Sequence, residues 1–191
     1  MRKKDDEKAR CIKEAVVKLI LQEGFHGASI SKIAKMAGVS PATVYIYFEN
    51  KENMLQEIYR EYSEEIFAYM LDGASNGMDG HQLIEFLLRG HYNFILNHKE
   101  IFNYVEQFSN CPALTGGCSD KKGFAKINNL LDEMKKNRII KDYSNEILAA
   151  MMFSPIKAVA ADINKSAAER EAQLKEMIKI IQEAVLIPRQ T

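Results

Sequence analysis

Apolar residues recur at helical spacing along almost the whole chain of 191 residues. The pattern predicts a first helix over about 5–23, ended by Gly24, and a short second helix, "ISKIAKMA", that begins after Ser29. Ser40 and Pro41 are typical of the start of a third short helix. Asn50 is suited to cap a long fourth helix. Further helices are expected over 81–98, 100–109, 121–137, 144–164 and 167–186. The predicted class is all-α, with about nine helices.

The second and third helices have the layout of a helix-turn-helix. Gly38 between them relaxes the turn, and the branched side chain of Val44 can anchor the third helix. At about 100° per residue, Val44 and Phe48 point the same way and define the buried face. Ala42 and Ile46 then point outward, where they suit contact with thymine methyl groups. A helix presented in this way can enter the major groove of DNA.

The charge distribution is consistent with that interpretation, although the net charge is zero. Residues 1–50 contain 9 Lys and Arg against 6 Asp and Glu, whereas the remaining residues contain 17 against 20. No signal peptide and no membrane-spanning run is visible, so we expect a cytoplasmic protein without a membrane partner. The odd count of 3 cysteines argues against a secreted disulfide framework.

The stretch "ISKIAKMAGVSPATVYIYFENKENML" closely resembles the DNA-binding region of the tetracycline-repressor (TetR) family of bacterial transcription regulators. The preceding "AVVKLILQEGFHGASI" resembles the first helix of that family. The resemblance implies a helix-turn-helix DNA-binding domain over 1–52 and an effector-binding and dimerisation domain over 53–191. It implies a homodimer that binds double-stranded DNA at a near-palindromic operator, acts as a repressor and is released by a small-molecule effector. We expect no cofactor.

The resemblance also implies which residues contact the phosphates or the bases of DNA, several of them from the ends of helices. Family members often have a polar or aromatic residue at the position of Ile46. Because isoleucine is apolar, we expect an apolar contact there in this chain. The candidate DNA-binding residues are Ser29, Ser31, Ser40, Pro41, Ala42, Thr43, Tyr45, Ile46, Tyr47 and Lys51.

The middle of the chain is rich in Phe and Tyr, and the helix near 81–98 carries two apolar stripes, as a helix surrounded by others does. These side chains either fill the core or line a cavity for a small apolar effector. The resemblance favours an effector pocket in this region. The candidate lining residues are Tyr62, Phe86, His91, Tyr92, Ile95, Phe102, Phe108, Phe124 and Met151.

The last two predicted helices carry apolar residues at spacings of three and four. The resemblance implies that this helix pair meets its symmetry mate as a four-helix bundle, which gives a two-fold dimer. The candidate interface residues are Ile156, Val159, Ile163, Leu174, Met177, Ile178, Ile181 and Val185.

Two alternatives remain open at the level of sequence. Cys111 and Cys118 could make a thiol- or metal-responsive regulator, but their spacing is not the C-x-x-C of a typical zinc site, so we predict no metal. An all-helical enzyme is the other alternative. Against it, the histidines of this chain do not combine with acids or a nucleophile at any spacing typical of catalysis. The four histidines are His26, His81, His91 and His98.

Overall fold

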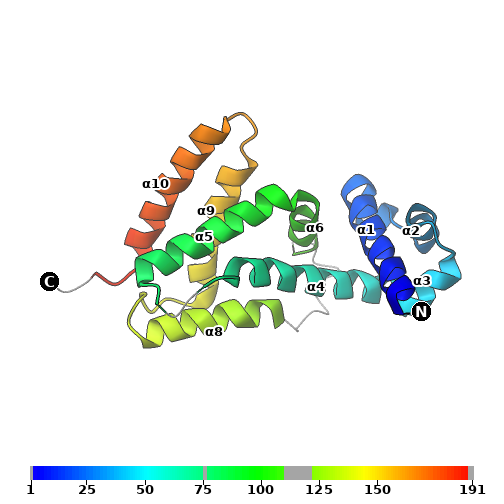
Figure 1. Ribbon diagram of the computed structural model, residues 1–191, viewed down its shortest axis with the longest axis horizontal. Helices are drawn as coiled ribbons and strands as arrows, with labels where there is room; N and C mark the ends of the chain where they lie inside the picture. Colours follow the sequence, from blue (N-terminus) through cyan, green and yellow to red (C-terminus); the bar gives the residue numbers. More distant parts are fainter. Residues whose placement is uncertain (1, 75–76, 110–121, 189–191) are drawn as a thin grey trace. The chain divides into compact units, whose positions relative to one another are not determined.

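The computed structural model describes residues 2–74, 77–109 and 122–188. Within these ranges the chain is all-α, with nine helices and one isolated antiparallel bridge between Ile140 and Leu186. The helices are α1 (Arg2–Gly27), α2 (Ile30–Ala37), α3 (Pro41–Tyr47), α4 (Lys51–Leu71), α5 (Gly80–Asn97), α6 (Lys99–Ser109), α8 (Lys122–Lys136), α9 (Asn145–Ala161) and α10 (Ala167–Val185), as Figure 1 shows. They correspond one for one to the predicted helices, and the all-α class is confirmed.

The first helix differs from its prediction at both ends. It begins at Arg2 rather than near residue 5, and a further turn follows Gly24. Gly24 itself has φ 71° and ψ 176°, which is not helical, so the geometric break lies at the predicted glycine.

Packing divides the chain into two units. The first contains α1, α2, α3, α4 as far as Ser63, and α6; the second contains the rest of α4 with α5, α8, α9 and α10. The helix α6, although it lies in the expected effector domain, therefore groups with α1 to α3 and the first part of α4. The functional boundary after residue 52 stays a prediction.

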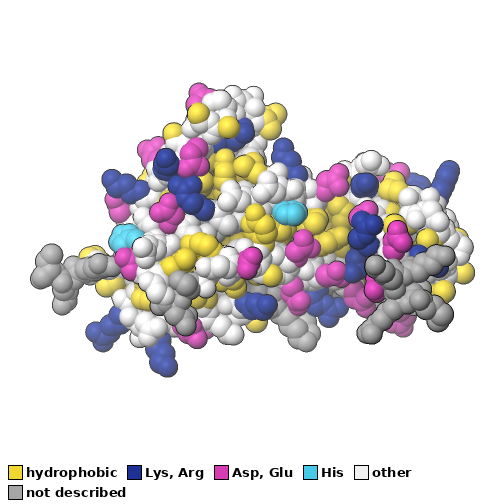
Figure 2. Space-filling view, in the orientation of Figure 1, with side chains coloured by type: hydrophobic (Ala, Val, Ile, Leu, Met, Phe, Trp, Pro, Cys, Tyr) yellow, Lys and Arg dark blue, Asp and Glu magenta, His cyan; other side chains and the backbone are white. Residues whose placement is uncertain are grey.

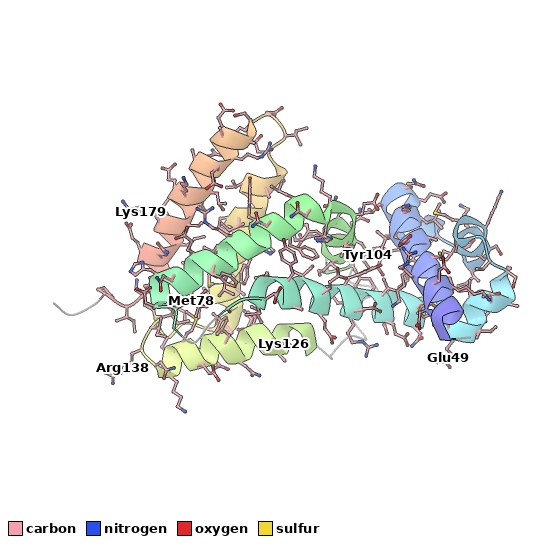
Figure 3. All side chains as sticks on the ribbon, viewed as in Figure 1. Glu49, Met78, Tyr104, Lys126, Arg138 and Lys179 are labelled. Carbon is pink, nitrogen blue, oxygen red and sulfur yellow. The ribbon has the colours of Figure 1, made fainter. Side chains whose placement is uncertain are left out.

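Aromatic side chains attach α6 to the first unit. The hydroxyl of Tyr104, which Figure 3 labels, donates a hydrogen bond of 2.9 Å to the carbonyl oxygen of Leu55 in α4. The ring of Phe108 stacks on Tyr59 of α4 at a centroid distance of 4.3 Å and meets the Phe25 ring edge-on at 5.8 Å. Burial raises the pKa of the Tyr104 phenol far above its ordinary value, so this hydroxyl stays a donor.

The second unit is built around α5, which packs against α9 and α10. The Arg89 guanidinium bridges two of these helices, with Nε 2.7 Å from a Glu85 carboxylate oxygen in α5 and Nη1 3.0 Å from a Glu171 carboxylate oxygen in α10. Near the end of α10, the Lys141 N–H donates to the carbonyl of Val185 at 2.8 Å. No helix in the described part of the chain combines the length and apolar character that spanning a membrane would take.

Candidate nucleic-acid interface

The turn between α2 and α3 is specified by short-range contacts. The Ser29 Oγ accepts a hydrogen bond from the Lys32 N–H at 3.3 Å and so caps the start of α2. At the other end, Gly38 has φ 68° and ψ 29°, and the Val39 N–H donates to the Ala34 carbonyl at 3.0 Å. This left-handed C-cap reverses the chain within a few residues, as a helix-turn-helix requires.

The predicted faces of α3 are confirmed. Ser40 caps the helix by accepting from the Thr43 N–H at 3.1 Å. Val44 is fully buried, whereas the side chains of Tyr45 and Ile46 are 56% and 77% exposed. Ala42 is exposed as well. Figure 2 shows hydrophobic side chains at the surface at the α3 end of the first unit.

The hydroxyl groups expected to meet DNA divide into two sets. Ser40 and Thr43 share a side-chain hydrogen bond of 2.9 Å, so both hydroxyls take part in the cap. Ser31 is exposed near the start of α2, and Tyr47 is half-buried. Pro41 occupies the first position of α3 and is exposed. The DNA contacts of these residues stay predictions.

The lysines of the interface have structural partners that the sequence did not reveal. The Lys51 ammonium donates to the carbonyl oxygen of Phe25 at 2.7 Å, and the Lys32 ammonium donates to the carbonyl of Gly27 at 3.1 Å. Both lysines therefore tie α4 and α2 to the end of α1. Lys35, which the prediction omitted, is exposed in the last turn of α2 and is a better phosphate candidate than Lys51. Its outward position in "ISKIAKMA" was the available signal.

Replacing Gly38 tests the turn. We expect Gly38→Val to lower the free energy of unfolding by about 1–3 kcal/mol, because a β-branched residue is strained at φ 68°. Gly38→Asn is the matched control, since asparagine tolerates the left-handed region. It should lower the free energy of unfolding less than Gly38→Val does. Urea unfolding measures both. Equal losses in the two variants would contradict the role assigned to the backbone conformation.

The candidate effector-pocket residues fall in both packing units. Tyr62, Phe102 and Phe108 are buried in the first unit. In the second unit, His91, Tyr92 and Ile95 are buried, Phe86 is half-buried and Met151 is 36% exposed. The Phe124 side chain lies outside the described residues. The pocket lining stays a prediction.

His91 is the buried histidine of this set. Its ring lies 5.2 Å from the Phe153 ring, and burial, with a smaller contribution from the positive charge of Lys157, lowers the His91 pKa to about 4. The imidazole in the folded protein is therefore neutral at pH 7.

This pKa makes stability depend on pH. The unfolded chain takes up a proton at His91 below its ordinary pKa of 6.5, whereas the folded chain does so only near 4, so stability is full above 6.5 and is lost as pH falls toward 4. We expect the protonation linked to His91 to lower the free energy of unfolding by about 2 kcal/mol between pH 7 and pH 5. Urea unfolding of His91→Gln should show a weaker pH dependence than wild type. His26→Gln is the control, because His26 is exposed. If the free energy of unfolding changed with pH in both variants as it does in wild type, the prediction would be contradicted.

Burial separates the candidate dimer residues into two groups. Leu174, Ile178, Ile181 and Val185 of α10 are at most 4% exposed, and Ile156 and Val159 of α9 are also buried within this chain. Met177 is half-buried, and Ile163 is 82% exposed. The buried seam packs inside the subunit, so it offers little surface to a second copy. The large apolar residues exposed on the same helices are Ile147, Met151 and Ile180.

The cysteines considered for a thiol or metal response lie mostly outside the described residues. Cys111 and Cys118 lie outside the described residues, and Cys11 is a half-buried free thiol in α1. Among the residues that are described, no three His, Cys, Asp or Glu side chains gather in a way that could hold a metal ion.

Comparison with known proteins gives one family match and several relatives. Residues 12–58 match the model of the bacterial regulatory proteins of the tetR family. The fatty acid metabolism regulator protein of Bacillus subtilis is 29% identical over 82 residues, 43% of this chain and 42% of that protein. The chain spans about two fifths of the length of the first curated relatives it matches.

Solved structures extend the similarity to the whole fold. A TetR family transcription regulator from Marinobacter aquaeolei VT8 superposes with a TM-score of 0.82 at 27% identity, over 98% of this chain and 100% of that one. The regulator FadR from Bacillus subtilis, solved in complex with stearoyl-CoA, superposes with a TM-score of 0.69 at 21% identity, over 90% and 96%.

An exposed recognition helix on a short helical scaffold defines the class of helix-turn-helix proteins. Within that class, residues 12–58 match the tetR family model, and the structural similarity covers the whole fold. Through its head, α1 to α3, the chain is similar to the tetR family of bacterial regulatory proteins.

Proposed function

We propose that this protein is a sequence-specific DNA-binding regulator of transcription, and a repressor in particular. The observation that carries the proposal is the division of α3: Val44 is anchored in the core while Tyr45 and Ile46 are largely exposed. A helix that displays aromatic and apolar side chains to water, beside an excess of Lys and Arg in residues 1–50, is suited to the major groove. We place this action in the cytoplasm, where operator DNA is available.

Our proposal includes a homodimer and a near-palindromic operator. On α9, Ile147 and Met151 lie one turn apart and are exposed, and Ile180 is exposed on α10. These side chains could be buried by a second copy of the chain, with Ile163 at the edge. Two copies related by a two-fold axis would present two α3 helices, and each would read one half-site.

Release by a small-molecule effector is the regulatory part of the proposal. The helix α6 packs on α1 and α4 through Tyr104 and Phe108, so a displacement of α6 would act directly on the head. An effector that prefers the displaced conformation would lower DNA affinity by the coupling energy, typically about 1–3 kcal/mol or roughly 5- to 150-fold. Because the structural neighbour FadR was solved with stearoyl-CoA, long-chain acyl-CoA is the first effector class to test.

Fluorescence anisotropy with DNA from upstream of the protein's own gene tests DNA binding. Specific binding should exceed binding to scrambled DNA, and its log affinity should fall linearly with log salt. The proposal would be overturned if neither the upstream DNA nor any sequence from a random pool bound more tightly than scrambled DNA.

The same assay tests the effector. Stearoyl-CoA should weaken binding of the specific duplex, whereas coenzyme A without the acyl chain should not. Release by the effector in the Cys111→Ser, Cys118→Ser double variant would exclude the thiol-responsive alternative. Release that needs both cysteines would favour it instead.

A further inference from the structure

The outward face of α3 carries an apolar strip where a hydrogen-bonding side chain could have stood. Ile46 is 77% exposed, and Ala42, one helical turn earlier on the same side, is exposed too. Neither side chain has a donor or an acceptor. Readout by this strip must therefore rest on apolar contact.

Two neighbouring side chains, Thr43 and Val44, cannot take over that contact without leaving their own. Thr43 is half-buried and shares its hydroxyl with Ser40 in the helix cap at 2.9 Å. Val44 is fully buried in the core. Ile46 is thus the one large aliphatic side chain that α3 directs to the outside.

The major groove offers one apolar group for such a side chain. Guanine, cytosine and adenine present only hydrogen-bond donors and acceptors there, whereas thymine adds its 5-methyl group. We infer that Ile46 reads a 5-methylpyrimidine, so that each operator half-site has a thymine at the base pair facing Ile46. This inference rests on the proposed function and deepens it.

Readout of the methyl group discriminates between bases that hydrogen-bond readout would treat alike. Only the methyl group matters, so 5-methylcytosine with its guanine partner can restore part of the affinity that unmethylated cytosine loses. Uracil, which keeps every hydrogen-bonding group of thymine, should be bound less well than thymine.

The experiment starts with duplexes that the wild-type full-length protein selects from a random pool. In the enriched site, each thymine is replaced singly by deoxyuridine and binding is measured by anisotropy. At the position facing Ile46, we expect about fourfold weaker binding for one half-site and roughly 15-fold for both, which corresponds to one buried methyl group per half-site.

Two variants assign the effect. In Ile46→Ala, the thymine and uracil duplexes should bind almost equally at that position while the rest of the profile is kept. Met36→Ala is the matched control, because Met36 is also an exposed apolar residue of the head, at 42%, but lies on α2. It should keep the whole wild-type profile.

The outcomes separate the inference from the function on which it rests. If no sequence is enriched, the proposed function fails. If a site is enriched but no uracil replacement weakens binding, or if the sensitivity persists in Ile46→Ala, the methyl readout by Ile46 is wrong and the function stands.

Discussion

Phe108→Ala is expected to lower the free energy of unfolding of the first unit by about 3–5 kcal/mol. Phe108 is fully buried, stacks on Tyr59 at 4.3 Å and meets Phe25 edge-on at 5.8 Å. Truncation removes both aromatic contacts and leaves a cavity between α6, α4 and α1. Urea unfolding followed by circular dichroism measures the loss.

Phe108→Leu is the matched control, because it keeps most of the volume and loses the aromatic contacts. It should lose about 1–2 kcal/mol. If Phe108→Ala lowered the free energy of unfolding less than Phe108→Leu did, or by less than about 1 kcal/mol, α6 would not be an integral part of the core of the first unit.

Ile46→Glu is expected to weaken binding to the specific duplex by roughly 100-fold or more, since like charges brought together in an interface cost several kcal/mol. The carboxylate would enter a groove bordered by phosphates. Because Ile46 is 77% exposed, the unfolding free energy should change by no more than about 0.5 kcal/mol. Anisotropy and urea unfolding give the two values.

Ile46→Gln separates the charge from the loss of apolar contact. It should bind more tightly than Ile46→Glu, and the difference should shrink as salt rises, because salt screens the repulsion. Equal affinities for the two variants at low salt would mean that position 46 does not approach the phosphates in the complex.

Local sequence determined the helices and the turn. Ser29, Gly38 and Ser40 act on residues within a few positions of themselves, so caps and turn could be predicted without knowing the rest of the fold. The exposed position of Ile46 followed from helical geometry once Val44 was taken as the buried anchor. These features gave both the all-α class and the DNA-binding head.

The candidate sites beyond the head could not be predicted in the same way. The apolar spacing on α10 shows that Leu174 and Ile178 share a face, but not which neighbour covers that face. The structure covers it with the same chain. Likewise, the basic character of Lys51 was visible in sequence, but its bond to the Phe25 carbonyl joins residues 26 positions apart.

The sequence by itself therefore determined the elements, the caps of α2 and α3 and the outward face of α3, because each depends on contacts within one or two helical turns. Only the tertiary structure decided that α6 packs in the first unit, that the α10 seam faces inward and that His91 is buried and neutral. These depend on which distant helices meet. Since an apolar stripe specifies only that it must be covered, the partner that covers it is set by the packing of the whole chain.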